Sequence, residues 1–389
     1  MENKERALAH VEKIEWIRPI EGADNIELIG VLGWVCIAKK GEFNVGDMAV
    51  YIEIDSKCPE TDERFAFLAN KKFKVKTMKL GKFKVISQGL ALPLSLFPEL
   101  QDKKIGDDVT EALKITYASE EDAARKTNKI DPNAKYKSMA KRRPKLFANP
   151  IVRRIMRYSI GRKIMFLLFG RKKDNPKKFP DWIVKTDETR IENAPFYLQS
   201  TEKWIKTEKC DGTSCTFAVD RLKKGKNKFD FIVCSRNVRQ ADREQACYHE
   251  SNIYWELADK YDIEKILTQF ATENNYNRVV LQGEGVGSVQ GNPYKFTENK
   301  LLVFNLIIDG TRLGTVEMAD FCKSHGLTSV PIIDTAYELP KTMEEMKLEA
   351  DGYSELNPKV KREGFVYRDI SGQKSFKNVS REYLLNHGI

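Results

Sequence analysis

The chain has 389 residues and a formal net charge of +10, with 41% hydrophobic and 10% aromatic residues. This composition supplies enough apolar side chains for packed cores and excludes wholesale disorder, and the length suits two domains better than one. No apolar run approaches the length of a membrane span, so no integral membrane association is expected, and residues 1–10 do not resemble a signal peptide. The seven cysteines form no CxxC pair, which argues against a disulfide framework or a zinc site and predicts an intracellular protein, cytoplasmic or nuclear.

Residues 1–118 are predicted to form a domain of short strands separated by turns. Turn residues gather at 21–25, 40–42 and 45–47. Short strands at this spacing are typical of a small all-β barrel. The expected strands are Val11–Ile17, Ile26–Val31, Val35–Ile37, Ala49–Ile54, Phe73–Thr77, Phe83–Ile86 and Leu90–Leu92.

Residues 119–178 are expected to be a basic, partly helical linker or insertion. Nineteen Lys and Arg face only two acids between Arg125 and Lys178, so the rest of the chain is net acidic. Such a block is either a solvated linker or a segment that attracts phosphate backbones. Ile151–Phe169 predicts one or two amphipathic helices broken at Gly161. Packing against the protein or gripping RNA is preferred for these helices over lying on a membrane surface.

Residues 179–389 are predicted to form a mixed α and β domain. The expected helices are His249–Leu257, Ile263–Glu273 and Val316–Ser324. The expected strands are Phe229–Ser235, Val279–Gly283, Leu301–Ile308, Glu363–Arg368 and Gln373–Lys377. The chain as a whole is therefore expected to belong to the multidomain α+β class.

The segment Lys209-Cys210-Asp211-Gly212 contains a lysine followed by one spacer residue and then Asp-Gly. A lysine amine attacks phosphorus only when it is neutral, so nearby cations or a metal ion must lower its pKa. The glycine lets a nucleotide approach the backbone closely. Taken alone the pattern is weak, because a lysine-rich chain contains such matches by chance and Lys209 could be an ordinary surface residue.

Five further segments follow in a fixed order and strengthen this interpretation. Each has an ordinary structural explanation by itself: Phe304 suits a hydrophobic core and Glu284 suits a turn. Together with the lysine segment they make the ordinary explanation improbable. The five segments are Ser235–Asn237, Leu281–Gly285, Leu302–Asn305, Arg362–Val366 and Lys374–Lys377.

The six segments resemble the motifs of the covalent nucleotidyltransferases, and those of the RNA ligases most closely. The resemblance covers residues 186–389 strongly, and residues 1–118 resemble an OB fold at the turn 19–25 and at Ser87–Leu90. It implies an N-terminal OB-like barrel followed by an adenylation domain, residues 179–389, with antiparallel sheets and flanking helices. DNA ligases and capping enzymes carry their OB domain after the last motif. The reversed order and Thr186–Ile191 resemble the RNA ligase branch that seals nicks with RNA 3′-OH ends.

The resemblance implies ATP-dependent joining of RNA 3′-OH and 5′-phosphate ends in RNA repair or editing. Lys209 would attack ATP to form lysyl–AMP, AMP would pass to the RNA 5′-phosphate, and the 3′-OH would displace it. Lys377 and Glu363 are the other implied catalytic residues, Lys377 acting on the α-phosphate. Mg²⁺ or Mn²⁺ is implied at Glu363 and Glu284, through water.

The resemblance also assigns a nucleotide-binding set. Glu208 matches the carboxylate that reads adenine, Phe304 the ring that stacks on it, and Arg236 a phosphate-binding arginine. The full set is Glu208, Asp211, Gly212, Arg236, Glu284, Phe304 and Lys374.

Two departures from the family pattern affect these assignments. Ser375 stands where many relatives have the first lysine of the last motif, and whether Lys374 takes its place stays open. Ser214 stands where some relatives have asparagine.

The expected partner is a nicked RNA duplex, and the expected state is a monomer. Alternatives are a DNA ligase, a capping-type enzyme, or an RNA-binding protein with a degenerate transferase domain. A tract at 141–145 resembles a nuclear signal, as basic tracts in RNA enzymes often do.

Overall fold

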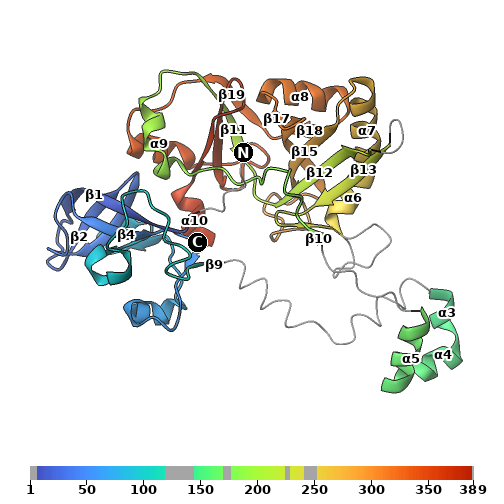
Figure 1. Ribbon diagram of the computed structural model, residues 1–389, viewed down its shortest axis with the longest axis horizontal. Helices are drawn as coiled ribbons and strands as arrows, with labels where there is room; N and C mark the ends of the chain where they lie inside the picture. Colours follow the sequence, from blue (N-terminus) through green and yellow to red (C-terminus); the bar gives the residue numbers. More distant parts are fainter. Residues whose placement is uncertain (1–6, 119–143, 170–176, 224–227, 241–251, 388–389) are drawn as a thin grey trace.

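The computed structural model describes residues 7–118, 144–169, 177–223, 228–240 and 252–387. Figure 1 shows an N-terminal domain of strands, a small helical unit and a larger C-terminal domain. Residues 119–143 and 170–176 of the basic segment, and with them most of the tract at 141–145, lie outside the described residues. Within the described part of the chain, no helix has the length and apolar character that crossing a membrane requires.

The N-terminal domain is built on a curled antiparallel sheet of five strands. β1 serves both halves of this sheet, because Ala9–Lys13 pairs with β4 and Ile14–Pro19 pairs with β2, with an irregularity near Trp16. The expected strand pattern is therefore largely confirmed, with small shifts of the strand ends. In sheet order the strands are β3 (Trp34–Lys39), β2 (Ile26–Val31), β1 (Ala9–Pro19), β4 (Met48–Ile52) and β8 (Leu90–Pro93).

The Ser87–Leu90 step joins the two edges of this sheet. The Gln88 amide donates to the carbonyl of Val35 at 2.8 Å, and the Gln88 carbonyl accepts from the Tyr51 hydroxyl at 3.1 Å. Gly89 has a φ of +97°, and a Cβ built there would lie 2.5 Å from the ring of Tyr51. Glycine is needed at this position both for its backbone conformation and for the room that Tyr51 takes.

One expected strand of this domain, Phe73–Thr77, is wrong. Lys72 and Phe73 both adopt left-handed backbone conformations, with φ of 55° and 59°, which interrupts an extended run. The chain here follows a 3₁₀ helix, η1 (Glu63–Lys71), and leads to short strand pairs instead. The short strands are β5 (Ser56–Lys57), β6 (Met78–Leu80), β7 (Val85–Ser87) and β9 (Thr116–Tyr117).

Three short helices make up the helical unit, α3 (Pro144–Ala148), α4 (Pro150–Arg157) and α5 (Ser159–Phe169). The helical prediction is confirmed, but the break lies at Tyr158, not at Gly161. Tyr158 is extended, and Gly161 lies inside α5. A Cβ at Gly161 would sit 2.1 Å from the carbonyl oxygen of Ile155, so the glycine allows α4 and α5 to meet closely.

Two antiparallel-rich sheets form the C-terminal domain. The large one runs in the order β10-β14-β13-β12-β15-β16-β17, with β18 beside β16, and the small one in the order β19-β11-β20-β21. The small sheet consists of β19 (Ile332–Tyr337), β11 (Trp204–Lys209), β20 (Gly364–Asp369) and β21 (Ser375–Val379). The large sheet consists of β10 (Lys177–Lys178), β14 (Val238–Arg239), β13 (Phe229–Cys234), β12 (Thr213–Arg221), β15 (Arg278–Val286), β16 (Lys300–Ile308), β17 (Thr311–Arg312) and β18 (Thr328–Ser329).

Helices α6 (Ile253–Lys260), α7 (Ile263–Glu273) and α8 (Thr315–Ser324) cover the large sheet (Figure 1). Their apolar residues and those of the sheet share one buried core. The expected helices are thus confirmed in kind, although α6 begins at Ile253 and residues 249–251 lie outside the described part. Two helices escaped the sequence analysis, α9 (Met343–Ala350) and α10 (Arg381–His387).

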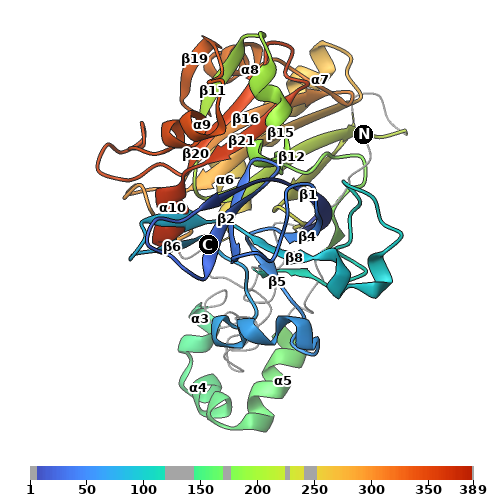
Figure 2. The same ribbon diagram turned by 90° about the vertical axis from the view of Figure 1, so that its left-hand side faces the viewer.

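The C-terminal helix α10 joins the two domains. Tyr383 and Leu384 belong to the same buried core as Trp34 and Tyr51 of the N-terminal sheet, and Figure 2 shows α10 next to that sheet. Asn193 adds polar links, because its carbonyl accepts from Trp34 Nε1 and its amide donates to Glu53, both at 2.5 Å. The two domains are therefore held together by a shared apolar core and by buried hydrogen bonds.

A buried ion pair stabilises this junction. Lys347 donates to Glu192 at 2.6 Å and to the carbonyl of Val379 at 2.7 Å, and both side chains are buried. Glu192→Ala leaves the Lys347 ammonium uncompensated and should lower the free energy of unfolding by about 3–5 kcal/mol. Lys203→Ala, which breaks an exposed pair with Glu338, should cost about 1 kcal/mol or less. Urea unfolding measures both, and equal losses would contradict the assignment.

Candidate functional site

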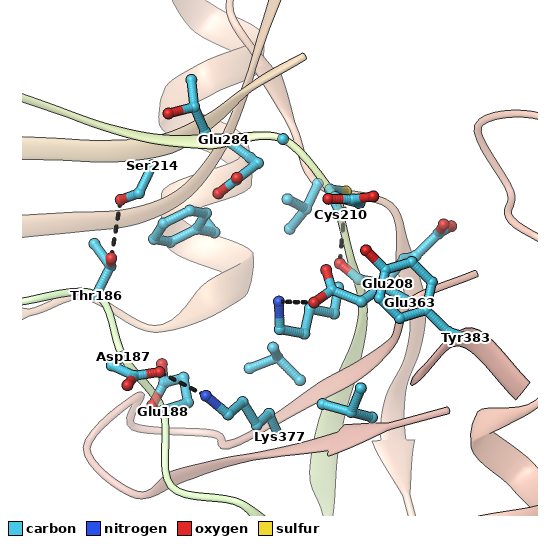
Figure 3. A pocket seen from close by; sticks show the side chains of 18 of the residues that line it. Thr186, Asp187, Glu188, Glu208, Cys210, Ser214, Glu284, Glu363, Lys377 and Tyr383 are labelled. Atoms are coloured by element: carbon cyan, nitrogen blue, oxygen red, sulfur yellow. Dashed lines mark hydrogen bonds and ion pairs between the residues drawn. The ribbon is translucent and has the colours of Figure 1, made fainter. Parts of the chain in front are cut away.

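A cavity of about 500 Å³ opens where the two sheets of the C-terminal domain meet the N-terminal domain. Figure 3 shows carboxylates, lysines and an aromatic ring that point into it from several strands. Of the ten predicted site residues, nine line this cavity and Lys374 does not. The nine are Lys209, Lys377, Glu363, Glu208, Asp211, Gly212, Arg236, Glu284 and Phe304.

Lys209 lies at the point where the chain crosses from one sheet to the other. It is the last residue of β11 in the small sheet, and Thr213 begins β12 in the large sheet. The three residues between them must turn within a confined space. A Cβ at Gly212 would lie 2.4 Å from the carbonyl oxygen of Gly285, so a larger residue would push the sheets apart. The Asp-Gly of the sequence pattern is therefore a packing requirement of this crossing.

Strand register aligns several cavity residues on one face of the small sheet. Thr207 pairs with Val366, and Val366 pairs with Lys377 on the next strand. Lys209 follows Thr207 by two residues and so faces the same side. Lys209 pairs with Gly364, which places the preceding residue, Glu363, beside its side chain. Glu363 and Lys377, which are far from Lys209 in sequence, therefore line the cavity together with it.

Lys209 Nζ donates to Glu363 Oε1 at 2.6 Å (Figure 3). Burial by itself lowers the pKa of the amine, but the charge and hydrogen bond of Glu363 and the charges of Glu284 and Asp211 outweigh it, so the pKa is raised. A lowered pKa was expected for Lys209, and the shift has the opposite direction. The carboxylates surround the amine and hold it in the ammonium form.

Carboxylates crowd the wall that faces Lys209. Burial raises the pKa of Glu284 to about 8, with Glu363 and Asp211 adding to the effect and Lys209 and Arg236 opposing it. Burial also raises the pKa of Glu363. Burial outweighs the nearby cations at both carboxyl groups, so a further cation in the cavity would favour their charged forms.

Glu208 and Phe304 mark the more apolar end of the cavity. Glu208 is 2% exposed; its Oε2 accepts from the Glu355 amide at 2.8 Å, and its buried Oε1 has no hydrogen-bond partner within the described residues. Burial raises the pKa of this carboxyl. Phe304 is half-buried and packs against a small cluster that includes Cys210 and Val330. A buried acceptor and an aromatic ring that line the same cavity fit a planar ligand that donates a hydrogen bond.

At the other end of the cavity, Asp187 forms ion pairs with Lys377 and Arg236. Its Oδ1 accepts from Lys377 Nζ at 2.5 Å and its Oδ2 accepts from Arg236 at 3.2 Å. Arg236 is about half exposed, whereas Lys377 is buried. Asp187 lies in the segment Thr186–Ile191, which resembles one branch of the family, but the predicted site did not include it.

The rest of that segment is fixed by a buried network. Glu188 accepts from Arg368 at 3.0 Å and from Arg312 at 3.3 Å, and Ser375 donates to it as well. Burial would raise the pKa of Glu188, but the two arginines outweigh it and lower the pKa. These contacts tie the segment to β17, β20 and β21 and thereby position Asp187.

Lys374 is the one predicted site residue that the structure places elsewhere. It lies in the exposed turn before β21, where its ammonium pairs with Glu202 at 2.7 Å and 2.9 Å. The side chain of Lys377 lines the cavity from β21. Lys374 lies in the turn before this strand, and its side chain does not line the cavity. Ser375 points to Glu188 instead. Neither residue replaces the missing first lysine of the motif.

Ser214, the other departure from the family pattern, does line the cavity. It lies on β12 opposite Glu284 of β15. Its hydroxyl and that of Thr186 are 2.9 Å apart (Figure 3). Ser214 therefore links the segment that carries Asp187 to the carboxylate wall.

The N-terminal domain and α10 complete the wall in ways that no local sequence signal announced. Asp55 and Tyr117 line the cavity from the N-terminal domain, and Tyr383 and His387 line it from α10. Asp55 accepts from Arg190 at 3.0 Å. These residues come from segments outside the recognised motifs, so tertiary contact was needed to find them.

The carboxylate set fits a hydrated divalent cation. No group of three or more His, Cys, Asp or Glu side chains within the described residues is arranged to enclose a metal ion directly. Glu284 and Glu363 line the cavity together with Lys209, and the pKa of each carboxyl group is raised. Oxygen ligands with incomplete charge compensation suit Mg²⁺ or Mn²⁺ held partly by water and phosphate.

Family models match two parts of the chain. Residues 8–94 match an OB-fold domain, and residues 202–380 match the RNA ligase family. The predicted OB-like start and the ligase domain are thus both confirmed. A comparison with curated proteins gave no match.

Solved structures of an RNA ligase from Naegleria gruberi resemble the chain over almost its whole length. The complex with pyrophosphate has 31% identity and a TM-score of 0.75, and covers 98% of this chain and 99% of that chain. A mutant with ATP and Mn, and another with AMP and Mn, each have 30% identity and a TM-score of 0.74 at the same coverage. From this identity and coverage, and from the motif residues gathered in one cavity, it follows that the chain belongs to the RNA ligase family of ATP-dependent nucleotidyltransferases.

Proposed function

We propose that this RNA ligase forms a covalent adenylate on Lys209 and seals nicks in duplexes whose 3′-OH end is RNA. The observation that carries the proposal is the position of the Lys209 amine, which lies in the cavity within 2.6 Å of Glu363. Lys377 and Arg236 lie on the same cavity wall. A nucleophile between carboxylates and phosphate-binding cations suits attack on a nucleotide.

The reaction has three balanced steps. The neutral Lys209 amine attacks the α-phosphorus of ATP, a P–N bond forms, and pyrophosphate leaves. A 5′-phosphate oxygen of the RNA then attacks that phosphorus, the P–N bond breaks, and an adenylated RNA end results. In the last step the 3′-OH attacks the RNA 5′-phosphate, AMP leaves, and a phosphodiester joins the strands.

The side chains around Lys209 suit this sequence. Glu363 accepts a hydrogen bond from Nζ and is placed to hold the proton that the amine loses. Lys377 is buried, so its charge acts at low dielectric on a phosphate brought near it. Asp187 forms ion pairs with Lys377 and Arg236, and a triphosphate would compete with Asp187 for these two cations.

The base end of the cavity suits adenine. The free Oε1 of Glu208 accepts a hydrogen bond from an exocyclic amino group, which adenine has at the corresponding edge and which guanine replaces by a carbonyl. Phe304 supplies a ring on which the base can stack. A bound Mg²⁺ or Mn²⁺ held at Glu284 and Glu363 through water would offset phosphate charge.

The solved relatives support the same assignment. The Naegleria gruberi structures contain ATP and Mn, AMP and Mn, or pyrophosphate. ATP is the substrate of the first proposed step, pyrophosphate is its leaving group, and AMP leaves in the last step. Their substituted residues include a lysine and an aspartate spaced as Lys209 and Asp211 are. They also include a glutamate and a lysine separated along the chain by the same number of residues as Glu363 and Lys377.

The first prediction concerns the covalent intermediate. Protein stripped of bound AMP with pyrophosphate, then given α-labelled ATP and Mg²⁺ or Mn²⁺, should retain the label. Lys209→Ala should retain none, because no other amine occupies its place. Lys374→Ala should retain label within about twofold of wild type, because an exposed ion pair outside the cavity contributes little. No label on wild type with either ATP or GTP would favour an RNA-binding protein with an inactive site.

The second prediction concerns the polynucleotide. A nick with an RNA 3′-OH strand and a 5′-phosphate, in a duplex, should be sealed with ATP faster than an all-DNA nick of the same sequence. The reason is that the domain order resembles that of the nick-sealing branch. Gel analysis of labelled strands measures both rates. Equal or faster sealing of the all-DNA nick would indicate a DNA ligase, and sealing of unpaired ends alone would rule out nick sealing.

The third prediction concerns the charge of Lys209. Burial lowers its pKa and Glu363 raises it, so Glu363→Gln should lower the pKa and increase the neutral fraction at any pH below it. Competitive acylation at pH 8, read at Lys209 by mass spectrometry on nucleotide-free protein, should show several-fold higher reactivity. Glu284→Gln should raise reactivity less, because Glu284 exerts the smaller charge effect. Unchanged reactivity in Glu363→Gln would exclude Glu363 as the cause.

A further inference from the structure

The helical unit α3–α5 leaves apolar side chains in solvent. Figure 1 shows it set apart from both domains. In α5, Ile160, Ile164, Leu167 and Leu168 follow the spacing of a helix stripe that normally faces a protein core. All four are exposed, Leu167 to 84% and Ile160 to 70%. Of the two interpretations that the sequence favoured for these helices, packing of this stripe against the protein is not observed, and gripping RNA stays a prediction.

The neighbouring helix α4 repeats the arrangement. Ile151 and Ile155 lie one turn apart and are both exposed, Ile151 to 70%. Arg153 and Arg157 lie two residues further along in each case and so project from the opposite side of the helix. Because Gly161 lets α4 and α5 approach closely, the two helices form one connected unit with two exposed apolar stripes.

The charge of the unit has a single sign. Residues 144–169 contain six basic residues and no acidic residue. Five of the six are borne by α4 and α5, which keeps cations beside the exposed apolar stripes. These five are Arg153, Arg154, Arg157, Arg162 and Lys163.

We propose that α4 and α5 dock this RNA ligase on the surface of an anionic lipid bilayer. Aliphatic side chains enter the boundary between headgroups and acyl chains, and the arginines and Lys163 contact lipid phosphates. An RNA backbone explains the cations but offers no surface that gains from contact with Leu167 or Leu168. An acidic protein groove would explain the charge, but a bilayer matches both features over two adjacent helices.

Flotation of the full chain with lipid vesicles tests the proposal. The protein should bind vesicles of phosphatidylcholine and phosphatidylserine, and should bind pure phosphatidylcholine far less. The double variant Leu167→Glu/Leu168→Glu should lose binding at least about tenfold, because it removes apolar area and adds repulsion. Arg153→Gln/Arg154→Gln/Arg157→Gln should weaken it about a hundredfold.

A matched control and a folding check accompany these variants. Phe67→Glu changes an exposed apolar residue of η1 in the N-terminal domain and should leave vesicle binding unchanged. Thermal unfolding identifies any variant that fails to fold, and the single variant Leu167→Ser then replaces the double one. Because unfolding and flotation need no ATP, the result is independent of the proposed function.

Three outcomes would overturn the proposal. The wild-type protein could fail to float with anionic vesicles. The leucine variants could float as well as the wild type, which would attribute vesicle binding to charge alone. The leucine variants could instead abolish self-association or RNA binding while vesicle binding stays absent. Those results would assign the stripes to a second copy of the chain or to RNA.

Discussion

The site depends on the tight crossing between two sheets at Cys210–Gly212. β11 ends at Lys209 and β12 begins at Thr213, and the backbone of Gly285 leaves no room for a Cβ at Gly212. This crossing fixes where Lys209 lies with respect to both sheets. The small sheet contributes Lys377 beside it, and the large sheet contributes Glu284 opposite it.

The same crossing explains the electrostatic state of the cavity. Every predicted cation that lines it pairs with a carboxylate, Lys209 with Glu363 and both Lys377 and Arg236 with Asp187. These ion pairs limit the cost of holding charges in a partly buried place. Burial raises the pKa of Glu284, whereas the carboxylates around Lys209 outweigh burial and raise the pKa of its amine.

The N-terminal domain is part of the site and is not a separate appendage. Tyr383 and Leu384 of α10 share its core, and Tyr383 also lines the cavity. Arg190 links Asp55 to the segment that carries Asp187. A short, well-packed junction therefore joins the OB-fold sheet to the cavity.

Sequence alone determined the features that depend on local pattern. Alternation and turn residues placed most N-terminal strands, and helical periodicity placed α7 at its observed bounds. The six motif segments predicted the RNA ligase family, and nine of the ten predicted site residues line one cavity. They did so because nucleotidyl-transfer chemistry restricts which residue types can stand at each motif position.

Only the tertiary structure decided the features that depend on contacts between distant segments. It showed that Lys374 pairs with Glu202 outside the cavity, and that Lys209 is held as an ammonium by Glu363 from another strand. It added Asp55, Tyr117 and Tyr383 to the site and left the stripe of α5 in solvent. The physical reason is common to all of them. A residue's charge, burial and neighbours depend on segments far away in sequence, whereas strand alternation, helix periodicity and motif spacing depend on a few neighbouring residues.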